Sequence, residues 1–129
     1  AGSNRKLKFS TYLINDDAAM LREIVENAAG NKEDAIFTTG GTGVGPRDIT
    51  PETIQPMLEK ELPGIMEHIR MKYGAEKPNA LLTRAVAGFI DDTQIYTLPG
   101  SVKAVSEYIP EIMKTFEHLK YMRSGLDAH

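Results

Sequence analysis

One stretch of sequence decides the fold: Thr38-Thr39-Gly40-Gly41-Thr42-Gly43-Val44-Gly45-Pro46-Arg47-Asp48-Ile49-Thr50-Pro51-Glu52. A short apolar run, residues 35–37, leads into it, and residues 50–52 form a typical helix start. We call the connection between them, residues 40–49, the glycine loop. Its four glycines leave the backbone free of Cβ atoms, so successive N–H groups can approach an anionic or flat ligand.

The two common phosphate-binding motifs do not fit the glycine loop. A P-loop requires Lys and then Ser or Thr directly after its second glycine. Gly40 and Gly45 have the required separation, but Pro46 and Arg47 follow them. A dinucleotide fingerprint that starts at Gly41 has Pro46 in place of its third glycine. The loop therefore belongs to neither class.

Length and composition predict one globular domain over residues 1–129. The net charge of −3 argues against a nucleic-acid partner. The absence of cysteine excludes disulfides, thiol chemistry and Cys-ligated metals. No apolar run reaches the roughly 18 residues that a membrane-spanning helix needs, and no signal-peptide pattern opens the chain. We expect a cytoplasmic protein without membrane contact.

Strands and helices are predicted to alternate along the chain. Strands are expected at 7–14, 34–38 and 93–98, with extended chain over 80–90 and a turn at 91–92. Helices are expected at 18–29, from Thr50 as N-cap to a break at Pro63-Gly64, at 65–73, and from a Ser101 cap to about 119. Pro110 is expected to kink or split the last helix. The apolar stripe of that helix is predicted to comprise Val102, Val105, Ile109, Ile112, Met113, Phe116 and Leu119. This alternation predicts an α/β sheet with helices on both faces.

Three groups of polar or glycine residues follow predicted strands. Asp16 follows the first strand, the glycine loop follows the second, and Pro99-Gly100-Ser101 follows the last. In α/β sheets, ligands bind beyond the carboxyl ends of the strands. We therefore expect the three groups to meet at one edge of the sheet. Gly100 and Ser101 also open a helix, and a helix N-terminus favours anions.

Three motifs resemble those of the MoaB/MogA proteins of molybdenum-cofactor biosynthesis. The first motif is the stretch from Thr38 to Glu52. The second runs from Leu82 to Gly88 and resembles the family's Leu-Ser-Arg-x-x-Ala-Gly segment. The third runs from Leu98 to Val105 and resembles its Leu-Pro-Gly-(Ser/Asn)-Pro segment, with Val102 in place of the proline. The motifs occur in the family's order, and the resemblance that they carry extends over residues 12–119.

The resemblance implies a three-layer α/β/α sandwich with a mostly parallel sheet. It further implies that the protein binds molybdopterin and adenylylates it with Mg-ATP, releasing pyrophosphate, as a homo-oligomer (trimer or hexamer). The family begins with a further strand and helix before the segment that corresponds to Leu7. We expect this domain to lack both and so to be N-terminally incomplete. Two alternatives stay open: a non-catalytic MoaB-type protein that holds molybdopterin, and a CinA-like nucleotide-acting domain.

The resemblance also implies a set of site residues. Asp16 and Asp48 match the family's acidic positions and are predicted to be catalytic and to bind Mg²⁺, a hard cation that prefers oxygen ligands. Simpler roles remain open for both, namely helix capping for Asp16 and a contact with a helix dipole for Asp48. Arg47 is either a phosphate ligand or a solvated loop charge. The predicted ligand-binding residues are Thr39, Gly40, Gly41, Thr42, Gly43, Gly45, Arg47, Arg84, Pro99, Gly100 and Ser101.

Overall fold

The computed structural model describes residues 17–125. The predicted strand at 7–14 and the predicted site residue Asp16 lie outside the described residues. The helices are α1 (Ala18–Gly30), α2 (Thr50–Ile54), α3 (Pro63–Gly74) and α4 (Val102–Ser124), with two 3₁₀ helices, η2 (Gln55–Met57) and η3 (Pro78–Leu82). The strands are β1 (Ala35–Thr39), β2 (Lys60–Glu61), β3 (Ala87–Ile90) and β4 (Thr93–Leu98).

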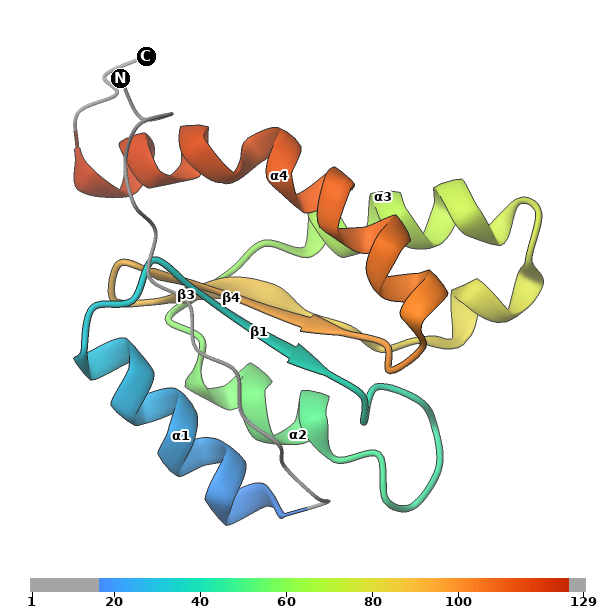
Figure 1. Cartoon of the computed structure of the whole chain (residues 1–129), viewed down its shortest axis with the longest axis horizontal. Coiled ribbons are helices and arrows are strands. Elements are labelled where there is room, and N and C mark those ends of the chain that lie inside the picture. The colour runs from blue at the N-terminus through green and yellow to red at the C-terminus, as the bar shows by residue number, and fades with distance from the viewer. Residues whose placement is uncertain (1–16, 126–129) are drawn as a thin grey trace.

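The strands form one sheet in the order β1-β4-β3-β2. Within residues 17–125, β1 and β4 pair in parallel, and β3 pairs antiparallel with both β4 and β2. Helices α1 and α2 cover one face of this sheet, and α3 and α4 cover the other (Figure 1). The predicted three-layer α/β/α sandwich is thereby confirmed. The sheet was also predicted to be mostly parallel, but within residues 17–125 only one of its three strand pairings is parallel, because β3 leads through a short turn into β4, which returns beside it.

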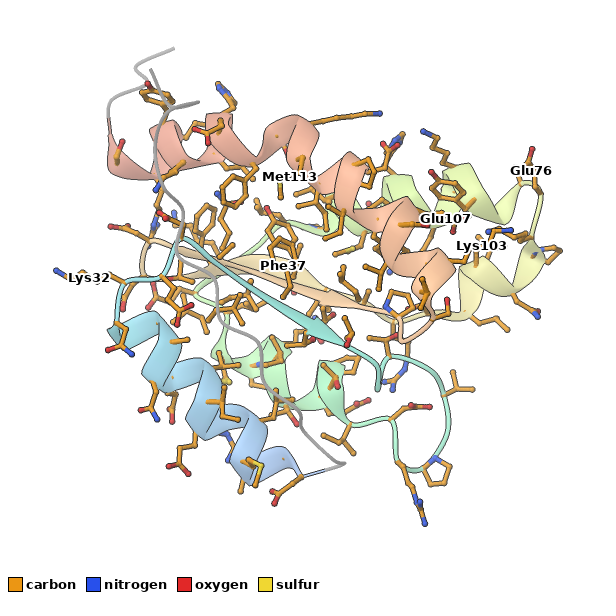
Figure 2. The ribbon with its side chains drawn as sticks, in the orientation of Figure 1. Lys32, Phe37, Glu76, Lys103, Glu107 and Met113 are labelled. Atoms are coloured by element: carbon orange, nitrogen blue, oxygen red, sulfur yellow. The ribbon has the colours of Figure 1, made fainter. Side chains whose placement is uncertain are left out.

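Alternating residues of the strands build two separate cores. On β4, Ile95 packs with Ile36 of β1 against α1 and α2, whereas Tyr96 faces α3 and α4. Phe37 of β1 lies on the α4 side of the sheet (Figure 2), where its ring stacks on Tyr96 with centroids 5.4 Å apart. The period of two in a strand sends neighbouring residues to opposite faces, so both faces of the central strands are apolar. Such a sheet must be covered on both sides.

Helix α1 forms as its sequence predicts. The Asp17 carboxylate accepts the N–H of Met20 at 3.0 Å and caps the helix. Leu21, Val25 and Ala28 recur at helical spacing and are buried against the sheet.

Helix α4 departs from its prediction in its end, which is Ser124 instead of about 119, and in two residues of its apolar stripe. The Ser101 hydroxyl accepts the N–H of Ala104 at 3.1 Å, which confirms the predicted cap. The helix then runs through Pro110 to Ser124, so the proline does not split it, and the ribbon bends along its length (Figure 1). Val102 is 87% exposed and Met113 is also exposed, contrary to the predicted stripe. Val102 is the first residue of the helix, directly after the Ser101 cap.

The chain between the glycine loop and β4 differs most from its prediction. The N-cap of α2 is Ile49, because the Thr50 hydroxyl donates to Gly40 O at 3.1 Å instead of capping the helix. The expected helix turns into η2 after Ile54, and Pro63 starts α3 rather than ending a helix. Proline is well tolerated in the first turn of a helix, since the N–H groups there lack helical partners.

Two short elements were not predicted. Residues 78–82 form η3, although extended chain is predicted from residue 80 onward. Residues 60–61 form β2, whose exposed, charged side chains give no apolar pattern. Strand β2 pairs with β3 at Gly88. A Cβ atom at Gly88 would overlap the carbonyl oxygen of Lys60, so this pairing requires glycine.

A buried carboxylate joins α3 to α4. Glu111 of α4 accepts the ammonium groups of Lys72 at 2.6 Å and Lys114 at 2.9 Å, and its other neighbour is His68 Nε2 at 3.2 Å. These partners, Lys72 first, lower the pKa of Glu111 to about 2. The group therefore stays ionised at neutral pH, paired to both its own helix and the neighbouring one.

Candidate functional site

The glycine loop and the start of α4 lie next to each other. The N–H of Gly40 donates to Leu98 O at 2.8 Å, directly beyond the parallel pair Thr39 and Leu98. A Cβ atom at Gly100 would be 3.3 Å from the Cα of Gly40. These contacts confirm that Pro99-Gly100-Ser101 and the loop meet at the carboxyl edge of the sheet. Lys103 lies on the first turn of α4 at the same edge (Figure 2).

The first two residues of the glycine loop have left-handed backbone conformations. Gly40 has φ +91° and Gly41 has φ +73°, and residues other than glycine rarely adopt such backbone conformations. Thr50 ties this part of the loop to α2: its N–H donates to Gly41 O and its hydroxyl to Gly40 O, each at 3.1 Å. A Cβ atom at Gly41 would overlap the Thr50 hydroxyl oxygen. The tight turn thus depends on both glycines.

Asp48 folds back over the glycine loop. Its Oδ2 accepts the N–H of Gly45 at 2.8 Å, and its own N–H donates to Gly45 O at 3.1 Å. Cβ atoms at Gly43 and Gly45 would lie 2.8 Å and 3.0 Å from this oxygen. These glycines therefore make room for a carboxylate. Within residues 17–125, Asp48 Oδ1 has no protein hydrogen bond, so it can bind a cation or a reactant.

Arg84 holds the loop from the neighbouring segment, between η3 and β3. Its backbone N–H donates to Thr42 O at 2.8 Å, and its side chain donates to Gly43 O at 2.8 Å and Asp48 O at 2.9 Å. A terminal nitrogen of the guanidinium also pairs with the carboxylate of Glu52 in α2. That hydrogen bond lowers the pKa of Glu52. Contact of Arg84 with a ligand stays a prediction, but its protein partners show that it supports the loop.

The remaining predicted residues divide by exposure. Thr42 is only 3% exposed, and its hydroxyl accepts that of Thr83 at 2.9 Å, so this side chain pins the loop to the segment before β3. Thr39 and Arg47 are exposed at this edge, and within residues 17–125 Arg47 makes no ion pair. Ser101 is exposed and caps α4. Their contacts with a ligand stay predictions.

Sequence reasoning missed two residues that shape the loop. Glu52 was interpreted only as a favourable residue for a helix start, and Thr83 had no assigned role. Both lie within the three recognised motifs, but their partners are 32 and 41 positions away in sequence. No local pattern reveals such pairs.

The described surface carries at least two clefts. One of about 420 Å³ is lined by α2, α3 and the segment 83–87, and includes Glu52 and Arg84. A larger one of about 710 Å³ lies at the opposite end of the sheet, between the end of α1, the β3–β4 turn and the end of α4. Within residues 17–125 there is no cluster of three or more potential metal ligands, and no described helix is long and apolar enough to cross a membrane.

Comparison with known proteins identifies the family. Residues 7–118 match the model of a family described as "Probable molybdopterin binding domain". Molybdenum cofactor biosynthesis protein B of Staphylococcus epidermidis is 46% identical over 88 residues, which are 67% of this chain and 50% of that protein. Gephyrin of Dictyostelium discoideum is 38% identical over 107 residues, which are 82% of this chain and 15% of that protein. The chain thus spans half or less of these two relatives.

Solved structures agree with this match. A molybdopterin biosynthesis protein from Mycobacterium abscessus superposes with a TM-score of 0.81 at 34% identity, covering 88% of this chain and 72% of that one. MoaB from Thermus thermophilus gives 0.78 at 35% identity, with 85% and 70% covered. CinA from Thermoplasma acidophilum, at 17% identity and a TM-score of 0.55, shows a likeness of fold alone. The resemblance inferred from the motifs is confirmed: the chain belongs to the molybdopterin-binding domain family of the MoaB and MogA proteins.

Proposed function

We propose that this domain binds molybdopterin and transfers an adenylyl group to it from Mg-ATP, forming adenylyl-molybdopterin and pyrophosphate. One observation carries the proposal: the glycine loop, with Asp48 folded over it, lies beside the N-terminus of α4 at the carboxyl edge of the sheet. Family membership supports molybdopterin as the ligand, and the arrangement suits phosphate groups. The adenylylation step is what the resemblance to the MoaB/MogA proteins implies, and the chemistry of this arrangement agrees with it.

Nucleotidyl transfer needs positioning and charge neutralisation more than a nucleophile on the protein. The backbone N–H groups of the glycine loop and of the first turn of α4 provide dipoles for phosphate oxygens. Arg47, exposed on the loop, provides a cation that can bind a phosphate through two nitrogens. Together they form a positive rim on which both phosphorylated substrates can be held.

Asp48 fits a role in binding Mg²⁺. Mg²⁺ in nucleotide sites is usually held by one or two carboxylates plus substrate phosphates, so a full cage of protein ligands is not required. Asp48 Oδ2 is held by Gly45 N–H, which leaves Oδ1 oriented by the loop. Asp16 remains the proposed second acidic ligand. When bound, the cation would neutralise charge on the phosphates.

Asp48→Asn tests the catalytic assignment. Asparagine keeps an oxygen that can accept the Gly45 N–H but removes the charge. We expect pyrophosphate release from ATP and molybdopterin to fall at least about a hundredfold, a loss typical for removal of an electrostatic group, while molybdopterin still binds. Asp92→Asn, at the opposite end of the sheet, is the control. Full turnover by Asp48→Asn would remove the assignment.

The wild-type protein decides between this proposal and the alternatives. Thermal stabilisation by molybdopterin without pyrophosphate release would support a non-catalytic binding protein. Stabilisation by a pyridine nucleotide, and not by molybdopterin, would support a CinA-like activity. We also propose a cytoplasmic trimer or hexamer. Light scattering coupled to size-exclusion chromatography measures the number of subunits.

A further inference from the structure

The glycine loop has little internal support of its own. Four of its ten residues are glycines, which lose more conformational freedom on ordering than any other residue. The hydrogen bonds within the loop are those between Gly45 and Asp48, and Thr50 holds the first two residues. These bonds do not connect the two ends of the loop with its middle, residues 42 and 43, which must be fixed from outside.

Arg84 supplies that support at three points. It binds the carbonyl oxygens of Thr42, Gly43 and Asp48, which are spread over most of the loop. A guanidinium carries five N–H donors in a rigid plane, so it can reach two carbonyls and a carboxylate together. A lysine ammonium is a compact charge on a flexible stem and cannot reproduce that arrangement.

Glu52 fixes the guanidinium in turn. It lies on the first turn of α2, on the same short helix whose Thr50 binds Gly40 and Gly41. The start of α2 thus holds one end of the loop directly and the rest through Arg84. Because the guanidinium binds Asp48 O and Glu52, it contacts the backbone of Asp48 and not its carboxylate.

We propose that Arg84 is a positioning residue, anchored by Glu52, that fixes the glycine loop and through it the carboxylate of Asp48. This inference rests on the proposed function for its catalytic part. Arg84 acts on the protein itself, so its effect is present before any ligand binds. A residue that only contacted ligand would leave the free protein unchanged.

Arg84→Lys tests the proposal, with Arg123→Lys as the matched control. Arg123 also donates to a backbone carbonyl and to carboxylates, but at the β3–β4 turn, far from the loop. Amide hydrogen exchange of residues 40–50 is measured on the free proteins. We expect it to speed up about tenfold or more in Arg84→Lys, corresponding to about 1.4 kcal/mol, and to stay unchanged in Arg123→Lys. Glu52→Gln, which keeps an acceptor, should give a smaller increase.

The rate of turnover provides a second, independent test of the role of Arg84. If Arg84 acts through Asp48, Arg84→Lys lowers kcat in the wild-type background but not further in Asp48→Asn. Unchanged exchange in residues 40–50, with molybdopterin binding nevertheless lost, would show a ligand contact and overturn the proposal. Equal exchange in Arg84→Lys and Arg123→Lys would overturn it as well. If the wild-type protein releases no pyrophosphate, the adenylylation proposal fails, and the exchange experiment still decides the role of Arg84.

Discussion

Gly41→Ala should destabilise the protein by about 3 kcal/mol, because it affects both backbone conformation and packing. Alanine at φ +73° destabilises the folded state by about 1–2 kcal/mol. Alanine also lowers the conformational entropy of the unfolded chain, which offsets about 0.4–1 kcal/mol of that loss. The new Cβ also overlaps the Thr50 hydroxyl oxygen and lies 3.2 Å from the Thr50 Cβ. Relieving this overlap costs about 1–3 kcal/mol and displaces the hydrogen bond to Gly40 O, worth about 1 kcal/mol.

Two other glycines separate these contributions. Gly40 has φ +91°, and no atom lies within 4 Å of the position that a Cβ would take, so Gly40→Ala should cost only about 1 kcal/mol, the conformational part. Gly30 ends α1 in open space without a left-handed φ, and Gly30→Ala should stabilise by about 0.5 kcal/mol. Urea unfolding followed by circular dichroism measures all three.

A double variant tests the cause directly. Removing the Thr50 hydroxyl should relieve part of the overlap, so Gly41→Ala with Thr50→Ala should cost at least about 1 kcal/mol less than the sum of the single changes. The reasoning is refuted if Gly41→Ala costs no more than Gly40→Ala, or if the two changes are simply additive. Either result would mean that Thr50 does not constrain the loop.

Three further predictions concern the fold. Glu111→Gln should remove a pH dependence of the free energy of unfolding. The pKa of Glu111 is lowered from 4.5 to about 2, with Lys72 the largest cause. The stabilisation by this carboxylate is therefore complete above pH 4.5 and is lost as the pH falls towards 2. Urea midpoints between pH 2 and 6 should therefore fall less in Glu111→Gln than in the wild type, and a parallel decline would contradict this. Phe116→Ala should cost about 3–5 kcal/mol, because the ring is 1% exposed between α4 and the sheet; an unfolding loss below about 1 kcal/mol would count against its place in the core. Gly88→Ala should separate β2 from β3, because its Cβ overlaps the oxygen of Lys60, and faster amide exchange at Leu62, whose N–H donates to Ala87 O, would report it.

Local patterns in the sequence were sufficient for the regular elements. The stripe of α1 and the boundaries 93–98 of β4 follow from the periods of 3.6 and 2 that helices and strands impose on apolar residues. The Ser101 cap likewise depends on residues only three positions apart, whereas the cap of α1 is Asp17 and not Asp16, for which capping was the simpler role. The position of the candidate site also followed from the sequence, since the loops after two parallel strands must emerge at the same edge.

Only the tertiary structure determined how the site is held together. The bonds from Arg84 to Glu52 and to Gly43 O, and the hydroxyl pair of Thr42 and Thr83, join residues 32 to 41 positions apart. Strand β2 exists because β3 offers it a partner and Gly88 leaves room, although its own two residues carry no strand pattern. Propensity and periodicity describe what a segment prefers by itself, whereas hydrogen-bond partners depend on which segments the fold brings together. The sequence thus determined where the glycine loop lies, and the packing of α2 and the segment around Arg84 determined its shape.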